Sequence, residues 1–98
     1  MTPEFEWDAK KADGNRKKHG VAFEEALTVF ADPLARIFDD PDNSEDERRE
    51  LIIGRSVKQR LLVVSFTERQ PRTRIVGART VTARERRDYE ESTKGTKT

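Results

Sequence analysis

The sequence predicts a single small α+β domain, in which two N-terminal helices pack on an antiparallel sheet of about four strands and a short C-terminal helix follows. A chain of 98 residues has room for only one hydrophobic core. Three apolar runs of strand length, at residues 51–56, 60–67 and 73–80, follow one another with short polar connections, as in an antiparallel meander. An apolar stripe within residues 23–30 has the spacing of a helix that covers a sheet.

The N-terminal half predicts one short strand and two helices. Residues 5–7 alternate apolar and polar side chains, as a strand does, and Asp8 follows in the position of a helix N-cap. A lysine-rich helix is expected over residues 9–19, because a glycine follows it at the usual stop position. The second helix covers residues 23–30, and Pro33 prevents it from continuing.

The connections and the C-terminus complete the predicted domain. A strand at residues 34–38 leads into an acidic loop at residues 39–50. The capping-box pattern at residues 82–85 starts a last helix, which has little apolar surface. The domain is therefore expected to span residues 1–91, with residues 92–98 as a disordered tail.

Charge is distributed unevenly along the chain. Residues 1–50 hold 8 Lys/Arg and 14 Asp/Glu, whereas residues 51–98 hold 12 and 5, so the halves carry −6 and +7. Residues 69–87 contain seven arginines, one glutamate and no lysine. Because the guanidinium fork pairs with phosphate and stacks on bases, this cluster indicates contact with RNA. The alternative is a surface that binds an acidic protein partner.

Several classes of site are excluded by composition. The chain has no cysteine and one histidine, so neither a disulfide framework nor a thiolate zinc site is available. The acidic run at residues 39–47 lacks the pattern of a calcium loop, because Glu45 stands where glycine is needed and Leu51 where glutamate is needed. No metal or cofactor is expected. The N-terminus is acidic and the apolar runs are short, so we expect neither an export signal nor a membrane span. The protein is therefore expected to be cytoplasmic.

RNA can be cleaved without a metal if side chains supply three things: a base for the 2′-hydroxyl proton, an acid for the leaving oxygen, and cations around the phosphorane. The candidates for these catalytic roles are His19, Glu68, Arg69, Arg74 and Arg79. Imidazole exchanges protons near neutral pH, which suits His19 to acid and base chemistry. Alternatively, His19 only caps the C-terminus of its helix.

One further set of residues completes the candidate site. The candidates for RNA binding are Lys18, Arg86, Arg87 and Tyr89. Strict alternation along the last strand places Arg74 and Arg79 on opposite faces of the sheet. They converge only if Gly77 marks a bulge or if Arg79 already belongs to the following turn.

Motifs in order along the chain resemble those of the BrnT toxins. In the first half they are Phe5-Glu6-Trp7-Asp8, Lys18-His19-Gly20-Val21, Phe23-Glu24-Glu25-Ala26 and Phe30-Ala31-Asp32-Pro33. From residue 49 onward they are Arg49, Ile53-Gly54, Leu61-Leu62-Val63-Val64, Thr67-Glu68-Arg69, Arg74-Ile75, Ala78-Arg79, and Glu85-Arg86 followed by Tyr89. The resemblance spans residues 5–91.

The resemblance implies a RelE-like fold and a ribonuclease toxin of a type II toxin–antitoxin pair, which cleaves RNA without a metal and arrests translation. It also implies a cognate antitoxin with a ribbon-helix-helix DNA-binding part, which neutralises the toxin and with it represses their operon. Family-motif positions are occupied by Lys18-His19, Glu68-Arg69, Arg74, Arg79 and Tyr89. Gly77 stands where serine is expected in many relatives. The alternative function is a non-catalytic module whose arginine face binds RNA or an acidic protein.

Overall fold

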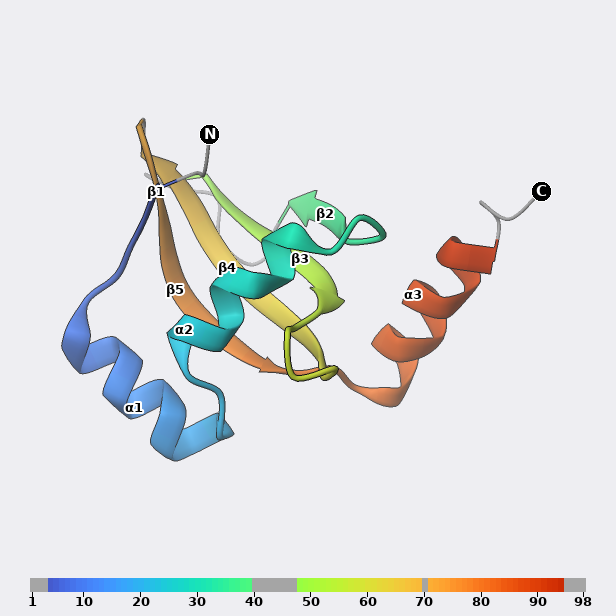
Figure 1. Cartoon of the computed structure of the whole chain (residues 1–98), viewed down its shortest axis with the longest axis horizontal. Helices are drawn as coiled ribbons and strands as arrows, with labels where there is room; N and C mark the ends of the chain where they lie inside the picture. The colour runs from blue at the N-terminus through green and yellow to red at the C-terminus, as the bar shows by residue number, and fades with distance from the viewer. Residues whose placement is uncertain (1–3, 40–47, 70, 95–98) are drawn as a thin grey trace.

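A computed structural model describes residues 4–39, 48–69 and 71–94 of the chain. It is an α+β fold built on a sheet of five strands (Figure 1). The elements in chain order are β1 Glu4–Glu6, α1 Ala9–His19, α2 Phe23–Ala26, the 3₁₀ helix η1 Leu27–Ala31, β2 Arg36–Asp39, β3 Arg49–Arg55, β4 Leu61–Arg69, β5 Arg72–Thr80 and α3 Ala83–Lys94. Within these residues, no helix is long and apolar enough to cross a membrane.

The sheet has the strand order β1-β5-β4-β3-β2. Strands β3, β4 and β5 form the antiparallel meander that the sequence predicts, and β2 pairs antiparallel with β3. The expected sheet of about four antiparallel strands is nevertheless wrong, because β1 adds a fifth strand that runs parallel to β5. Its three residues pair with Arg72–Arg74, more than 60 positions away along the chain. Local pattern predicts a strand but carries no information about such a distant partner.

Several predicted boundaries change. The expected helix at residues 23–30 is an α-helical turn that continues as the 3₁₀ helix η1. The hydroxyl of Thr28 donates a 2.6 Å hydrogen bond to the Glu25 carbonyl. The next N–H of a continuing α-helix would need the same acceptor, so the α-helix changes there to the tighter 3₁₀ helix. The acidic loop is shorter than expected, since β2 includes Asp39 and β3 begins at Arg49; residues 40–47 lie outside the described part.

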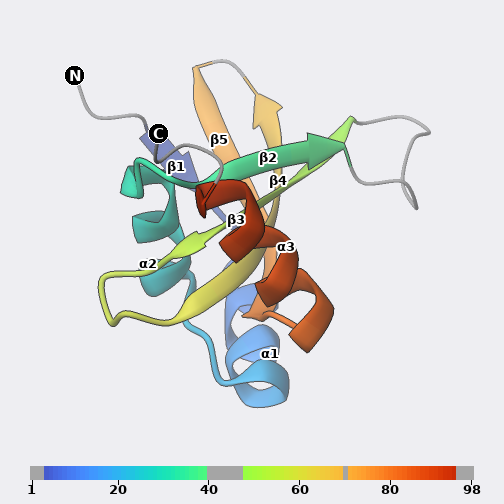
Figure 2. The same ribbon diagram turned by 90° about the vertical axis from the view of Figure 1, so that its right-hand side faces the viewer.

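Helix α3 also differs from expectation, because it extends to Lys94. Residues 92–94, assigned above to a disordered tail, are therefore helical, and residues 95–98 lie outside the described part. The helix packs on the sheet on the side opposite to α2, as the two views in Figures 1 and 2 show.

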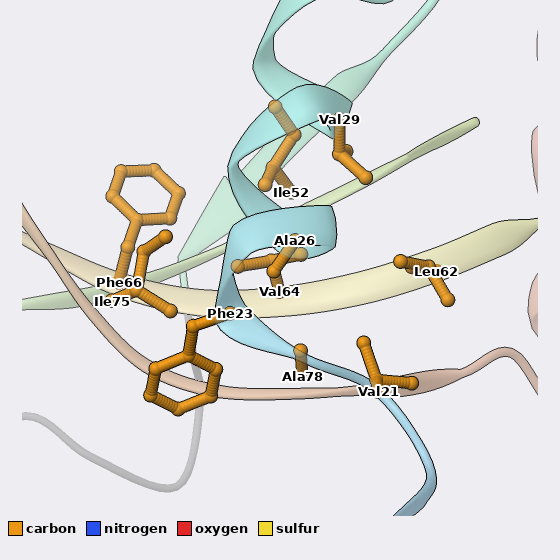
Figure 3. Packing of buried hydrophobic residues seen from close by; sticks show 10 residues of the cluster. All are labelled: Val21, Phe23, Ala26, Val29, Ile52, Leu62, Val64, Phe66, Ile75 and Ala78. Carbon is orange, nitrogen blue, oxygen red and sulfur yellow. The ribbon is translucent and has the colours of Figure 1, made fainter. Parts of the chain in front are cut away.

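The hydrophobic core lies between the sheet and the α2–η1 segment (Figure 3). Alternate residues of β4 point into it, namely Leu62, Val64 and Phe66, and all three are at most 1% exposed. We call this side of the sheet the core face. Trp7 packs edge-on against Phe23 with ring centroids 5.9 Å apart, so Trp7 belongs to the core as the sequence suggests.

The other side of the sheet, here the outer face, carries the intervening residues of β4. Leu61 and Val63 form a smaller buried cluster with Ile53 and with Tyr89 of α3. This cluster occupies only one end of the outer face, where β3 ends and β4 begins. The polar residues Ser65 and Thr67 continue along β4 toward the β4–β5 hairpin.

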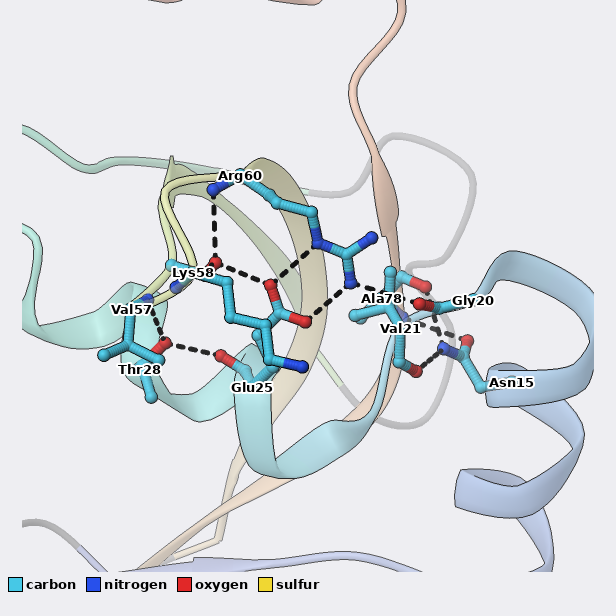
Figure 4. A network of polar contacts seen from close by, with 10 residues as sticks. Asn15, Gly20, Val21, Glu25, Thr28, Val57, Lys58, Arg60 and Ala78 are labelled. Carbon is cyan, nitrogen blue, oxygen red and sulfur yellow. Dashed lines mark hydrogen bonds and ion pairs between the residues drawn. The ribbon is translucent and has the colours of Figure 1, made fainter.

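A buried ion pair fastens the core-side helices to the start of β4 (Figure 4). The Glu25 side chain is 4% exposed, and both of its oxygens accept hydrogen bonds from the Arg60 guanidinium, at 2.6 and 3.0 Å. Ser56 donates a third bond to Glu25. The hydrogen bonds from Arg60 outweigh burial and lower the pKa of Glu25, so this carboxylate is charged and fully partnered in the core.

Helix α1 lies along the edge of β5 that β1 leaves free. The Asn15 amide donates to the Ala78 carbonyl at 2.8 Å and accepts from the Ala78 N–H at 3.1 Å, replacing a neighbouring strand (Figure 4). It also donates to the Val21 carbonyl beyond the end of α1. Asn15 therefore fixes the C-terminal end of α1 beside the last residues of β5.

Candidate RNA-binding site on the outer face

A β-bulge determines which arginines of β5 share a face. Ser65 of β4 stands opposite Gly77, whereas the next residue, Phe66, stands opposite Ile75, so Val76 is an extra residue in β5. Ile75 and Ala78 consequently both point into the core, although they are three positions apart. Arg74 precedes Ile75 and Arg79 follows Ala78, so both arginines project onto the outer face. Of the two conditions derived from the sequence, the bulge next to Gly77 is therefore met.

Arg74 belongs to a row of side chains that crosses four strands on the outer face. Its register partners place Arg49, Thr67, Arg74 and Glu6 in line from β3 to β1. Arg74 Nε lies 3.3 Å from a Glu6 carboxylate oxygen. In the adjoining row, Arg72 Nε lies 3.3 Å from Glu4. Strand β1 thus supplies two acids at the edge of a surface that is otherwise rich in arginine.

Arg79 stands at the other end of this face, beside the first turn of α3. Its guanidinium donates to both Glu85 carboxylate oxygens, at 2.8 and 2.9 Å. These bonds lower the pKa of Glu85 to about 2. Glu85 also accepts from the Thr82 N–H and donates its own N–H to the Thr82 hydroxyl, which confirms the predicted capping box.

The backbone positions of Arg74 and Arg79 are well separated, and their guanidinium groups pair with different acids, Glu6 and Glu85. The partners of the two arginines on β4 are Thr67 and Val63, four residues apart, which corresponds to about 13 Å along a strand. The single arginine cluster expected from the sequence is therefore two separate groups on one face. Such a spacing suits two phosphates of the same RNA strand.

The predicted residues Lys18 and His19 are exposed at the end of α1. His19 follows Asn15 by four residues, which is about one helical turn, and Asn15 is bonded to Ala78. The C-terminus of α1 is therefore beside the segment of β5 that carries Arg79. The structure brings His19, Lys18 and Arg79 to the same end of the sheet.

Glu68 and Arg69 lie at the opposite end, next to the β4–β5 hairpin. Glu68 pairs with Thr73 across the hairpin and accepts a 3.1 Å hydrogen bond from its hydroxyl. This places Glu68 on the core side of the sheet, away from the arginines of the outer face. Arg69 is exposed and stands opposite Arg72. The structure does not gather Glu68 with His19 or Arg79.

The candidates on α3 divide into two kinds. Arg86 and Arg87 are exposed, and Arg86 lies 3.9 Å from Glu90 in a loose ion pair. Tyr89, in contrast, is 6% exposed, and its hydroxyl donates a 2.9 Å bond to Asp32. Burial and the Asp32 carboxylate raise the pKa of Tyr89. Its ring anchors α3 to the sheet and is too buried to stack on a base, so the structure does not support the RNA-binding role predicted for Tyr89.

Sequence reasoning assigned no role in the site to three residues of this region. Asn15 gave no signal, because its strand-like bonding to Ala78 is visible only in three dimensions. Arg49 of β3 and Thr67 of β4 stand opposite each other, and this alignment depends on the register of the two strands. The sequence places Arg49 in the acidic loop, where two adjacent arginines, Arg48 and Arg49, next to a strand are the available clue.

The chain thus combines a helix-covered core face with a phosphate-suited arginine surface, the arrangement of a small nucleic-acid-binding α+β protein. Residues 7–85 match the family model described as "Ribonuclease toxin, BrnT, of type II toxin-antitoxin system". The chain therefore belongs to the BrnT family of ribonuclease toxins, and the resemblance found in its motifs is confirmed.

A solved structure supports the fold. The 1.1 Å crystal structure of the Brucella abortus ribonuclease toxin BrnT matches with a TM-score of 0.63, over 83% of this chain and 99% of that chain, at 20% sequence identity. At this identity the match establishes the shared architecture. A comparison with curated proteins finds no match.

Proposed function

We propose that this protein is a cytoplasmic endoribonuclease that cleaves RNA without a metal ion and thereby arrests translation. The observation that carries this proposal is the bulge in β5, which turns Arg74 and Arg79 to one face. The C-terminus of α1, with Lys18 and His19, lies at the same end of the sheet as Arg79, because Asn15 bonds to Ala78. An RNA strand that crosses the outer face would meet phosphate-binding cations at two points and a proton-transferring imidazole at one of them.

The reaction proposed is transfer of the phosphoryl group to the neighbouring 2′-oxygen. The O2′–P bond forms, the P–O5′ bond breaks, and the products are a 2′,3′-cyclic phosphate and a 5′-hydroxyl. His19 takes the proton of the 2′-hydroxyl, the departing 5′-oxygen takes a proton from water, and Arg79 stabilises the charge that develops on the phosphorane oxygens. Glu68 is left out of this proposal because it lies on the core side of the sheet.

Arg79 can bind a phosphate while it remains paired with Glu85. Its Nη1 donates to Glu85 and to the Thr80 carbonyl, and its Nη2 donates once to Glu85. A guanidinium has five N–H donors, so the Nε–H and one Nη2–H stay free of these partners. Both lie on one edge of the group, where they fit two oxygens of a phosphate. Glu85 therefore orients Arg79 without blocking it.

The proposal is tested by incubating the purified protein with a mixed-sequence RNA in excess chelator. We expect RNA fragments that end in a 2′,3′-cyclic phosphate. His19→Ala should lower the cleavage rate at least about 100-fold, since general acid and base groups contribute about 10²–10⁴-fold. Lys17→Ala is the matched control, because Lys17 is an exposed neighbour on α1 whose partner is Asp13. Intact RNA under these conditions would contradict the proposal.

We further propose that the partner of this toxin is an antitoxin with a ribbon-helix-helix DNA-binding part, which neutralises it by covering the outer face. Acidic side chains already pair with this face, since Glu4, Glu6 and Glu85 contact its arginines. A stoichiometric antitoxin should abolish cleavage and bind the operator DNA of the pair. Binding of the antitoxin that leaves cleavage unchanged would contradict neutralisation by occlusion.

The same carboxylate contacts favour one other function, a non-catalytic module that binds an acidic protein or RNA through the outer face. This module would bind RNA measurably and leave it intact in the chelator assay. The two functions are thus separated by one measurement.

A further inference from the structure

Two hydrogen-bond donors in the Arg49–Thr67–Arg74 row lack an acceptor, and a third makes only an ion pair. Thr67 is 1% exposed, and its Oγ1 has no hydrogen-bond partner among the described residues. The Nε of Arg49 is likewise buried and unpartnered there. Arg74 Nε lies 3.3 Å from Glu6 but without the geometry of a hydrogen bond. Buried polar atoms in folded proteins are almost always satisfied, so such a group requires an explanation.

The three atoms share one chemical need. Each can donate a proton, and two of them belong to cations, so the missing group is an acceptor with negative charge. The residues stand directly opposite one another on three neighbouring strands, which lie about 4.8 Å apart. Once the side chains that cover these buried atoms move outward, one oxyanion above Thr67 can reach the side chains on both sides.

We infer that Arg49, Thr67 and Arg74 form a binding subsite for a backbone phosphate of RNA. This inference rests on the proposed function, and it names a phosphate other than the one that is cleaved. The subsite lies on the same face as Arg79 and about 13 Å from it along β4. A strand whose cleaved phosphate contacts Arg79 thus places a flanking phosphate over Thr67.

Charge at this end of the outer face favours a phosphate of RNA. Arg49, Arg69, Arg72 and Arg74 lie in two adjoining rows. The acids Glu4 and Glu6 pair with Arg72 and Arg74 from the β1 edge. On the β3 side, Arg49 Nε has no acceptor within the described residues. Added negative charge is therefore stabilised most beside Arg49.

The subsite is tested with two variants and two matched controls. Thr67→Val removes the unpartnered hydroxyl and keeps the shape, while Thr73→Val removes a hydroxyl from the neighbouring strand on the core side. Arg49→Ala removes a donor of the row, while Arg48→Ala removes its exposed neighbour. Each is assayed on a dinucleoside monophosphate, which has one phosphate, and on a 12-nucleotide RNA.

We expect Thr67→Val and Arg49→Ala to lower kcat/KM for the 12-nucleotide RNA about tenfold, as loss of a charge-assisted hydrogen bond does. Cleavage of the dinucleoside monophosphate should stay unchanged, because it cannot reach the subsite. The Tm of Thr67→Val should equal or exceed that of the wild type, since a buried unsatisfied hydroxyl is removed. Thr73→Val and Arg48→Ala should cleave both substrates normally.

Equal cleavage of the long RNA by Thr67→Val and the wild type would overturn the subsite, as would equal losses on both substrates. Loss of antitoxin binding by Arg49→Ala with unchanged cleavage of long RNA would also overturn it, because the row would then bind protein carboxylates. The effect of inorganic phosphate on Tm distinguishes a failure of this inference from a failure of the proposed function. If the wild type cleaves no RNA but phosphate raises its Tm, and does not raise that of Thr67→Val, the proposed function fails and the subsite stands.

Discussion

The two faces of the sheet differ in how completely their polar groups are partnered. On the core face, the buried carboxylate of Glu25 has three side-chain hydrogen bonds, and Asn15 satisfies both backbone groups of Ala78. On the outer face, α3 covers one end, and buried donors of Arg49 and Thr67 have no acceptor within the described residues. Folding stability is therefore concentrated on the core face, while the outer face has hydrogen-bond donors that a ligand can use.

The largest expected effect on stability comes from the core face. Phe66 is 1% exposed, and its ring packs edge-on against Phe30 with centroids 5.0 Å apart. Phe66→Ala should lower the free energy of unfolding by about 3–5 kcal/mol, as large-to-small core changes do. Urea denaturation followed by circular dichroism measures this loss. A loss below about 1 kcal/mol would mean that the core face does not dominate stability.

The next effect comes from the buried ion pair of the core face. Arg60→Met leaves the Glu25 carboxylate buried without its cation, and because the Arg60 side chain is 38% exposed the cost at pH 7 should be about 2–3 kcal/mol, below that of a fully buried pair. The cost should shrink toward pH 4, because the pKa of Glu25 rises without Arg60 and the carboxyl can then take up a proton. Arg16→Met is the control, since Arg16 and its partner Asp13 are both more than half exposed. A cost independent of pH would contradict this account of the pair.

A smaller effect is expected from the Arg79–Glu85 pair on the outer face. Folding lowers the pKa of Glu85 from 4.5 to about 2. The pair therefore stabilises the protein above pH 4.5, and this contribution is lost as pH falls from 4.5 toward 2. Because the Arg79 side chain is 39% exposed, the contribution should be only about 1–2 kcal/mol.

Glu85→Gln tests this assignment. The variant should be less stable than the wild type at pH 7, and the difference should narrow below pH 4 in thermal unfolding curves. Glu90→Gln is a suitable control, because Glu90 makes only a loose ion pair with Arg86 at 3.9 Å. A difference that stays constant from pH 7 to pH 2.5 would show that Glu85 acts through its helix cap alone.

Much of the fold could be predicted from local pattern. The N-cap at Asp8 and the stop at Gly20 correctly predict the two ends of α1. Gly20 has the left-handed conformation that such a stop requires. The capping box at Thr82 and Glu85 correctly marked the start of α3. These features are short-range, so a few neighbouring side chains determine them.

The features that escaped prediction depend on distant contacts. The partner of β1 and the burial of Tyr89 require residues far away along the chain. The bulge could be stated only as a condition, because a glycine in a strand permits a bulge without requiring one. The candidate site was predicted as a list of residues, but its division into two groups follows from the register of β4 and β5.

The central claim is that the outer face carries the chemistry, with Arg79 at the cleaved phosphate. It is tested most directly by the single-turnover rate of RNA cleavage in excess chelator for Arg79→Ala, with Arg16→Ala as control. Removal of a group that stabilises a developing oxyanion should lower the rate about 100–1000-fold, while the control stays within about twofold of the wild type. A folded Arg79→Ala protein that cleaves RNA at the wild-type rate would contradict the claim.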